Sequence, residues 1–422
     1  MVSFESLFLK KLKVLLPSLI NDELFDFPAN IGWKEIYKKY EDEGVDRNPF
    51  VHHLKDHGIS HVQFWINHEQ AQKSWADEHN VKFEEKSWYL DILEAQIIRE
   101  RPDVIYNTTL TVIPYHFIRK IKGLLKKQCL WVCFYGVKRT GEYRKFREYD
   151  LYLTGFRELE SELRDENQKT IFFPHYFDDR YCKINYKTKK EITFSFIGSL
   201  AYRYDNHTFN RRRRLVERLM DETGLRVFSH LTRELNCPRE SLRQRWNALR
   251  WELYHLIDAF PRPFNFLSKT PILNKVKDWD VRPTPDFLFN ARLTKKVKPP
   301  KYGQALYNTL ARSRITLNVH GQVDANFGSA KFAAGNIRLF EATGAGTCLL
   351  TDDLPHIGDF FEPDKEIVTY QSPKDAEEKA LFLINNPREC LEIQRRGQHR
   401  AWKDHSSSTR AMEFSQILKE HA

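Results

Sequence analysis

Alternating helical and strand segments are the feature that most constrains the fold of this chain. Between residues 50 and 156, segments with apolar residues at helical spacing separate short apolar runs such as PDVIYNTTL, QCLWVCFYG and YDLYLTGF. The same alternation returns after residue 191 with ITFSFIGSL, RITLNVH and EIVTY. Strands that alternate with helices form parallel sheets covered on both faces, so we predict an α/β fold with doubly wound parallel sheets.

The chain length and two interruptions of this alternation predict the domain organisation. A length of 422 residues is typical of two or three domains. The segment IFFPHYFDDRY interrupts the alternation and predicts a boundary between two Rossmann-like domains, 46–175 and 176–400. Residues 1–45 are expected to form a helical lead-in, and 401–422 a helix that crosses back to the first domain. A stretch rich in Trp, Arg and Pro, about 235–301, is interpreted as an insertion in the second domain.

Charge and cysteine usage restrict the partners and the compartment. The formal net charge of +10 favours an anionic partner, such as a nucleic acid, an anionic lipid or a phosphorylated small molecule. The six cysteines are scattered without a CxxC pair, which is typical of a reduced, cytoplasmic protein. Charged residues interrupt the apolar N-terminus, and no run reaches the roughly 20 apolar residues of a membrane span. We therefore expect a soluble protein.

Polar residues follow three predicted strands of the second domain. They are Gly198 with Ser199, His320, and the pair Asp352 and Asp353. In open parallel sheets ligands bind at the carboxyl ends of strands, and the backbone N–H groups of a helix N-terminus suit phosphate. A helix that starts near residue 336 lies between the last two strand ends. The sequence therefore predicts a diphosphate site at this edge, with a clamp of arginines at 211–214 and with Glu341 as an acceptor for ribose hydroxyls.

Each of these residues also has a purely structural interpretation. The arginines at 211–214 match a solvated helix face. Glu341 is three residues from Arg338 on the same helix face and is able to pair with it. Gly344 and Gly346 suit a helix end before a strand, and His320 suits a core histidine. The sequence has no Walker P-loop and no GxGxxG fingerprint, which argues against an ordinary NTPase or dehydrogenase.

Four segments together resemble a known enzyme family. SRITLNVH, NIRLFEATGAGTCLLTDD, FFEPDKEIVTY and GQHRAWKDHSSSTRAMEF are similar to the C-terminal domain of bacterial glycosyltransferases related to the spore maturation protein CgeB. Weaker similarity extends upstream to about residue 50 and leaves out the insertion. The resemblance implies a GT-B architecture, in which two Rossmann-like domains face a cleft and the second holds a nucleotide-sugar donor.

The resemblance also implies roles for individual residues. It implies catalytic roles for His320, Arg338 and Glu341. The residue eight positions before Glu341 is Ala333, so the paired glutamates of many retaining GT-B enzymes are absent. The implied donor-binding residues are Gly198, Ser199, His207, Arg211, Arg212, Asn318, Asn336, Arg338, Glu341, Thr343 and Gly344.

The leading hypothesis is therefore a glycosyltransferase that moves a sugar from a UDP- or GDP-sugar to a hydroxyl of a glycan, lipid-linked or protein acceptor. We expect no metal and no cofactor, and family resemblance favours retention of the anomeric configuration. An inverting enzyme needs a general base, for which His61, His175 and His320 are the candidates. The alternatives are a nucleic-acid-binding protein that uses the basic, aromatic insertion, and a GT-B nucleotide-sugar epimerase.

A basic segment of the first domain suggests a peripheral membrane contact. In IPYHFIRKIKGLLKKQ, Ile118, Ile121 and Leu125 share one helical face. Five cations flank that face: Arg119, Lys120, Lys122, Lys126 and Lys127. The two interpretations are a helix that covers the sheet and a dock on an anionic membrane face.

Overall fold

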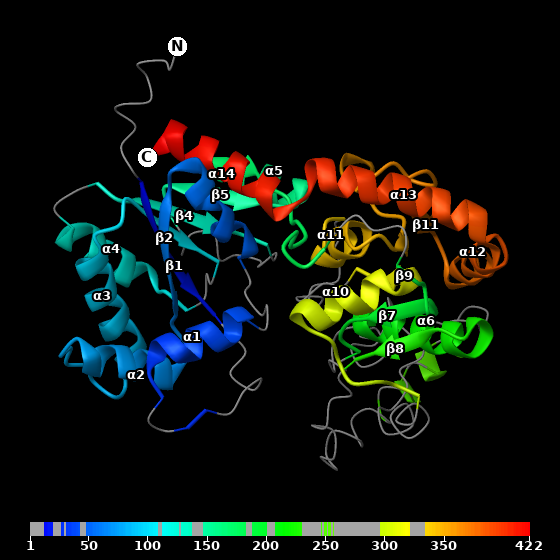
Figure 1. The fold of residues 1–422 in the computed structure, drawn as a ribbon, viewed down its shortest axis with the longest axis horizontal. Coiled ribbons are helices and arrows are strands. Elements are labelled where there is room, and N and C mark those ends of the chain that lie inside the picture. The colour runs from blue at the N-terminus through cyan, green and yellow to red at the C-terminus, as the bar shows by residue number, and fades with distance from the viewer. Residues whose placement is uncertain are drawn as a thin grey trace, which may run out of the picture.

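The computed structural model describes two parallel sheets, each covered by helices (Figure 1). It describes residues 12–19, 27–28, 31–42, 48–108, 112–125, 128–136, 147–182, 188–200, 207–229, 296–320 and 334–422, together with 246, 249–250, 252–254 and 256. For 207–211 it describes the backbone alone. Most of the predicted insertion at 235–301 therefore lies outside the described residues.

The first sheet has the strand order β2-β1-β3-β4-β5-β6, and all of its pairs are parallel. Its strands β3 and β5 are buried along their whole length, as expected where helices cover both faces of a sheet. The strands are β1 (Lys13–Ser18), β2 (Ser60–Trp65), β3 (Val104–Asn107), β4 (Leu130–Phe134), β5 (Leu151–Thr154) and β6 (Thr170–Phe172). The helices of this half are α1 (Trp33–Asp42), η3 (Pro49–His57), α2 (Glu69–Glu78), α3 (Trp88–Glu100), α4 (Tyr115–Leu124) and α5 (Arg157–Asp165).

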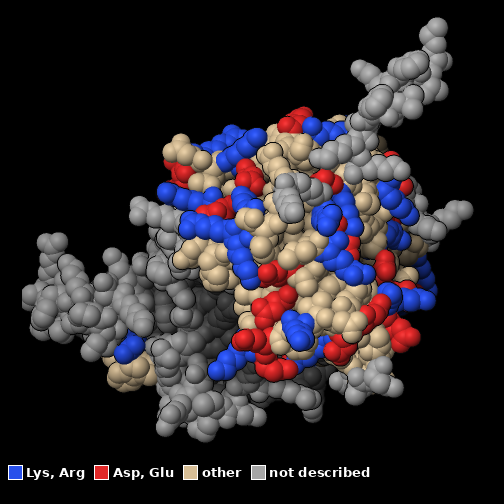
Figure 2. Space-filling model, turned by 90° about the vertical axis from the view of Figure 1, so that its left-hand side faces the viewer, with Lys and Arg blue, Asp and Glu red and all other residues tan. Residues whose placement is uncertain are grey.

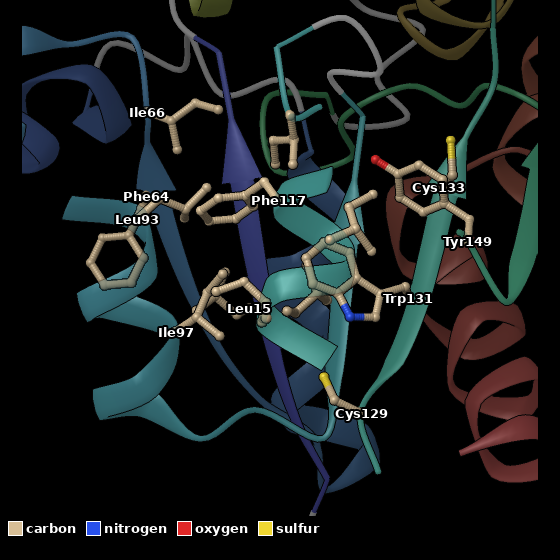
Figure 3. Close-up of a cluster of buried hydrophobic side chains, with 14 of the residues drawn as sticks. Leu15, Phe64, Ile66, Leu93, Ile97, Phe117, Cys129, Trp131, Cys133 and Tyr149 are labelled. Carbon is tan, nitrogen blue, oxygen red and sulfur yellow. The ribbon is translucent and has the colours of Figure 1, made fainter. Parts of the chain in front are cut away.

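The core of the first domain joins this sheet to α2, α3 and α4. Figure 3 shows its central side chains: Leu15 of β1, Phe64 of β2, Ile97 of α3, Phe117 of α4 and Trp131 of β4. Leu15, Ile97 and Trp131 are completely buried. This cluster fixes the sheet whose strand ends face the second domain.

The second sheet has the order β11-β10-β9-β7-β8 and is also entirely parallel. Its strands are β7 (Ile192–Ile197), β8 (Arg226–Phe228), β9 (Ser313–Asn318), β10 (Cys348–Asp352) and β11 (Val368–Tyr370). Its helices are α6 (His207–Thr223), α10 (Gly303–Ala311), α11 (Ile337–Gly344), η7 (Ile357–Asp359), α12 (Pro373–Asn385) and α13 (Pro387–Asp404). The predicted α/β class with two doubly wound parallel sheets is confirmed.

The chain crosses between the two domains twice, at neighbouring places. Phe173 belongs to the core of the first domain, and Phe177, four residues later, belongs to the core of the second. The return crossing precedes α14 (Ser407–His421), whose Phe414 packs in the first core. The crossings are hydrogen-bonded, because Phe177 N donates to His405 O at 3.0 Å and Ser407 N to Phe177 O at 2.9 Å. Consequently α13 and α14 run in succession over both domains (Figure 1).

The predicted helical lead-in at 1–45 is wrong where it includes β1. Lys13–Ser18 is an interior strand between β2 and β3, and Val14, Leu15 and Leu16 are completely buried. A strand buried on both faces is continuously apolar. Here the neighbouring lysines add charged residues to the apolar run, and the combined pattern is typical of an amphipathic helix. Within the same stretch, α1 is helical as expected.

Candidate active site

The order of the second sheet places a topological switch point between β7 and β9. From β7 the chain goes to β8 on one side, while β9 pairs on the other side. Gly198 and Ser199 follow β7, and Val319 and His320 follow β9. In sheets of this kind, ligands bind outside the carboxyl ends of the strands at the switch point. We call this region, together with the N-terminus of α11, the β7/β9 edge.

Arg212 of α6 bridges the two strand ends at this edge. Its guanidinium donates to Ser199 O at 3.1 Å and to Val319 O at 2.9 Å. Burial lowers the pKa of Arg212, which the charge of Asp352 partly offsets. Arg212 therefore lies where the sequence predicts, but two of its donors hold the loops after β7 and β9. The side chains of the predicted residues His207 and Arg211 lie outside the described residues.

Two asparagines tie the end of β9 to the start of α11. Asn318 Nδ2 donates to Asn336 Oδ1 at 3.1 Å, and Asn336 Nδ2 donates to Asn318 Oδ1 at 2.9 Å. Asn336 Oδ1 also accepts from Leu339 N at 3.3 Å, so Asn336 caps the helix. The backbone N–H groups of Ile337 and Arg338, in the first turn, have no acceptor within the helix. This arrangement aims the positive end of α11 outward from the β7/β9 edge.

Arg338 and Glu341 form a charged pair on α11 that retains unused hydrogen-bonding capacity. Arg338 Nη1 and Glu341 Oε2 lie 2.7 Å apart, but their angles do not make a hydrogen bond. Both atoms are buried, and neither has a hydrogen-bond partner among the described residues. Burial raises the pKa of Glu341, Arg338 lowers it, and the charge of Asp178 raises it again. Buried charged atoms are normally hydrogen-bonded, so this pair fits a site that a polar ligand completes.

His320 uses both ring nitrogens within the protein. Its Nδ1 lies 2.7 Å from Asp352 Oδ1, and Gly335 N donates to its Nε2 at 3.4 Å. The accepting role of Nε2 places the proton on Nδ1, which then donates to Asp352. Burial raises the pKa of Asp352, but the hydrogen bonds from the ring and the backbone N–H of His320 outweigh it, so the pKa is lowered. His320 thus positions Gly335 beside Asp352, and its catalytic role stays a prediction.

Thr343 and Gly344, which the resemblance placed in the donor site, lie at the other end of α11. The Thr343 hydroxyl donates to Leu339 O at 2.8 Å and to Phe340 O at 3.1 Å within the helix. Gly344 packs against the ring of Phe177, and its carbonyl accepts from Gln398 and Trp402 of α13. These contacts give the two residues a structural role between α11 and the interdomain crossing, and their contact with a donor stays a prediction.

The first domain meets the β7/β9 edge at the end of β5. A Cβ atom on Gly335 would lie 2.9 Å from Gly155 O, so the two backbones touch. The φ of Gly335 is +125°, which side-chain-bearing residues rarely adopt. Nearby, Arg157 Nε pairs with Asp359 Oδ2 at 3.0 Å, and the rings of Phe172 and Phe360 stack at 6.0 Å. The carboxyl edge of the first sheet therefore abuts the N-terminus of α11.

The two remaining candidate bases differ in position. His61 lies near the amino end of β2, with its ring 6.0 Å from that of His52, and so does not reach the carboxyl edge of the sheet. His175 follows β6, at the carboxyl edge that faces the second domain. Sequence reasoning missed Asp352 as the partner of His320. Its place at the end of the strand that pairs with β9 was the available signal.

Comparisons with known proteins agree with this geometry. A family described as glycosyl transferase-like matches residues 262–416, a stretch that includes β9, α11 and β10. No curated protein matches the chain by sequence. The chain therefore carries a glycosyltransferase-like C-terminal region.

Solved structures share the fold of nearly the whole chain. A glycosyltransferase from Rickettsia africae has a TM-score of 0.56 and 9% identity, with 98% of this chain and 99% of that chain covered. Anabaena Alr3699/HepE in complex with UDP-glucose has a TM-score of 0.54 and 10% identity, with coverage of 97% and 99%. Sucrose-phosphate synthase from Thermosynechococcus elongatus has a TM-score of 0.53 and 10% identity, with coverage of 97% and 98%. The predicted GT-B architecture is confirmed, and the expected enzyme class, a glycosyltransferase, is supported.

Proposed function

We propose that this protein transfers a sugar from a nucleoside diphosphate sugar to a hydroxyl acceptor bound on the first domain. The observation that carries the proposal is the buried Arg338–Glu341 pair, whose Nη1 and Oε2 atoms make no hydrogen bond among the described residues. It lies in the first turns of α11, within the stretch that matches the glycosyl transferase-like family. The narrower resemblance to CgeB-related enzymes remains part of this proposal.

The donor diphosphate lies at the N-terminus of α11. The N–H groups of Ile337 and Arg338, the helix dipole and the Arg338 guanidinium all favour negative charge there. Glu341, one turn further along, accepts hydrogen bonds from ribose hydroxyls. Asn318 and Asn336 hold the helix against β9, so these donors are fixed before the reaction. Fixed donors stabilise the charge that develops on the departing diphosphate.

In the proposed reaction, the acceptor oxygen approaches the anomeric carbon from the same face that the diphosphate leaves, and its bond to that carbon forms as the bond from the carbon to the diphosphate oxygen breaks. The acceptor proton leaves with the diphosphate. This scheme retains configuration, needs no side-chain nucleophile and uses neither metal nor cofactor. Asp352 is engaged by His320, and Asp353 accepts from Gln371 at 3.1 Å, so both strand-end carboxylates have protein partners.

A thermal-shift panel tests the proposal. UDP, GDP and their sugars should raise the melting temperature of the protein, because a ligand that binds only the folded state stabilises it. Transfer with the best donor should persist in EDTA. A strict requirement for Mn²⁺ or Mg²⁺ would contradict the metal-free scheme. Absence of any nucleotide shift, together with salt-sensitive binding to single-stranded nucleic acid, would replace the proposal with the nucleic-acid interpretation.

The expected membrane contact is weakened by the packing of α4. Ile118 and Ile121 are buried in the core, so the apolar face covers the sheet. Lys120 pairs with Glu94, and Lys122 with Asp150. Figure 2 shows Lys and Arg mixed with Asp and Glu on this side of the first domain. Within the described residues, no helix is both long and apolar enough to span a membrane.

A peripheral contact and a cytoplasmic location therefore remain proposals. Lys126 and Lys127 lie outside the described residues. Co-sedimentation with anionic and neutral liposomes at low and high salt tests the contact, because surface attraction is screened over about a Debye length, roughly 10 Å at 0.1 M salt. Binding to anionic vesicles that high salt abolishes would support it. Absence of binding at low salt would refute it.

A further inference from the structure

Three half-buried aromatic side chains gather at the carboxyl edge of the first sheet. Phe134 ends β4, Phe156 follows β5, and His175 follows β6, and these three strands are neighbours in the sheet. The ring of His175 lies 5.2 Å from that of Phe134 and 6.0 Å from that of Phe156. We call these side chains the three-ring cluster.

The three-ring cluster lies beside the end of α11 that is proposed to hold the donor. Phe156 is next in sequence to Gly155, whose carbonyl touches Gly335. Gly335 in turn precedes Asn336, the cap of α11. The contact between Gly155 and Gly335 therefore places the three-ring cluster close to the N-terminus of α11. A group transferred from a diphosphate at α11 has to meet its acceptor in this part of the molecule.

The His175 imidazole has hydrogen-bonding groups that the described part of the chain does not use. No hydrogen bond to its ring is found among the described residues, and its ring neighbours are the two phenylalanines. Burial lowers the pKa of His175 to about 4, so the ring is neutral at physiological pH. A neutral imidazole offers one N–H donor and one acceptor nitrogen. Both suit a hydroxyl group.

Building on the proposed function, we propose that Phe134, Phe156 and His175 form the acceptor subsite and that the acceptor is a carbohydrate. The apolar C–H face of a sugar ring lies on the aromatic rings, and a sugar hydroxyl bonds to the imidazole. Tyr and His side chains with an apolar body and a polar atom serve the same double purpose in other interfaces.

Within the described residues, the charge beside the cluster favours a neutral acceptor over a phosphorylated lipid. The neighbouring cation Arg157 is bound by Glu160 at 2.8 Å and Asp359 at 3.0 Å, and it lies 3.5 Å from the centre of the Phe172 ring. Arg157 is therefore held in the domain interface by three partners. A neutral sugar needs no cation, whereas a phosphate group would require one.

Acceptor kinetics of single variants test the subsite. The donor is the nucleotide sugar with the largest thermal shift, and the acceptors are p-nitrophenyl glycosides of glucose, galactose, mannose and N-acetylglucosamine. N-acetylserine methyl ester and octanol serve as hydroxyl compounds without a sugar ring. We expect transfer to at least one glycoside. Phe156→Ala and Phe134→Ala should each raise the KM for that glycoside about tenfold, which corresponds to the loss of an aromatic contact of about 1.4 kcal/mol.

Donor-side readouts separate this inference from the proposed function. The UDP-induced thermal shift and donor hydrolysis without acceptor should be unchanged in Phe156→Ala, and Phe156→Tyr should restore the acceptor KM. His175→Gln should also raise the acceptor KM. Tyr115→Ala is the matched control, because Tyr115 is 48% exposed on α4 and lies outside the cluster.

The outcomes are distinct. An unchanged acceptor KM in all three cluster variants, or transfer only to hydroxyls without a sugar ring, would overturn the subsite and leave the donor site intact. If no nucleotide or nucleotide sugar stabilises the wild-type protein and none is hydrolysed, both the proposed function and the subsite fail.

Discussion

Each of the two domains has a topological switch point in its sheet, but the side chains at the two switch points differ in charge. In the first sheet it lies between β1 and β3, where Asn48 Nδ2 donates to Ser18 Oγ at 3.2 Å and Asn107 donates to the Tyr149 hydroxyl. These side chains are buried and uncharged. In the second sheet the corresponding edge carries Arg212, Asp352 and the Arg338–Glu341 pair.

This difference shows that topology alone does not determine what a switch point binds. Both sheets present the carboxyl ends of their strands, but the side chains at the first switch point, between β1 and β3, are uncharged, whereas those at the second include Arg212, Asp352 and Glu341. This contrast is the reason that the proposed diphosphate site is assigned to the second domain. The neutral polar pairs and the three-ring cluster of the first domain suit an uncharged partner.

The largest expected effect comes from removing the charges of the second edge. Glu341→Gln keeps the shape of the side chain and should lower transfer at least about 100-fold, because the charged acceptor for the ribose is lost. Arg338→Met should abolish the UDP-induced thermal shift. Each change leaves one charge of a buried pair alone, which destabilises proteins by about 3–5 kcal/mol.

For this reason the double variant Arg338→Met/Glu341→Gln is the necessary companion. It removes both charges, and it should be folded by circular dichroism yet fail to bind UDP. Transfer at the wild-type rate by either single variant would remove the pair from the donor site.

A second effect concerns the packing that connects the charged edge to the interdomain crossing. In Gly344→Ala the new methyl group would overlap the ring of Phe177, and overpacking of this kind destabilises by about 1–3 kcal/mol. Gly358→Ala is the matched control, because nothing lies within 4 Å of the added atom. Urea unfolding compares the two variants. Equal stabilities would show that α11 and the crossing are not closely packed.

How far the sequence predicts this arrangement depends on the range of the interaction. Strand periodicity and polar strand ends predict the second edge from Gly198, His320 and Asp352, because these signals are local. The family resemblance, not the periodicity, implies Asn318, Asn336 and Arg338. The roles of His320 and Gly344 were not predictable, since they depend on partners 32 and 54 residues away.

The same reasoning explains the missed strand. β1 is recognisable only by its position between β2 and β3, which pair with it from residues 60–65 and 104–105. Its own residues, a short apolar run after lysines, favour a helix equally well. The three-ring cluster was also invisible, because its members come from three separate strand ends.

A smaller loss of stability is expected when the charge of Asp352 is removed. This change tests whether charge matters at the second switch point, in contrast to the uncharged first one. Asp352→Asn removes the charged partner of His320. Hydrogen bonds to charged groups contribute about 1.5–3 kcal/mol, so we expect the free energy of unfolding to fall by an amount near the lower limit of this range. The pKa of Asp352 is lowered in the folded protein despite its burial. The stabilisation is therefore present above the ordinary pKa of 3.8 and is lost as the pH falls through the lower folded value.

Urea unfolding of wild type and Asp352→Asn from pH 2.5 to 7 measures this difference. The two unfolding free energies should differ at pH 5–7 and converge below pH 4. A constant difference across this range would show that the charge of Asp352 does not stabilise the β7/β9 edge.

The smallest effect is expected at the uncharged switch point of the first sheet. Tyr149→Phe removes the hydroxyl that accepts from Asn107 and should lower the free energy of unfolding by about 1 kcal/mol, the usual contribution of a neutral hydrogen bond. The position of Tyr149 in the first core, beside Cys133, keeps the ring itself in place (Figure 3). Tyr115→Phe, at an exposed position of α4, is the control and should leave stability unchanged. The UDP-induced thermal shift should be the same in both variants, because the proposed donor site lies in the other domain. A weakened UDP response in Tyr149→Phe alone would mean that the first switch point contributes to nucleotide binding, and the division of chemistry between the two sheets would have to be abandoned.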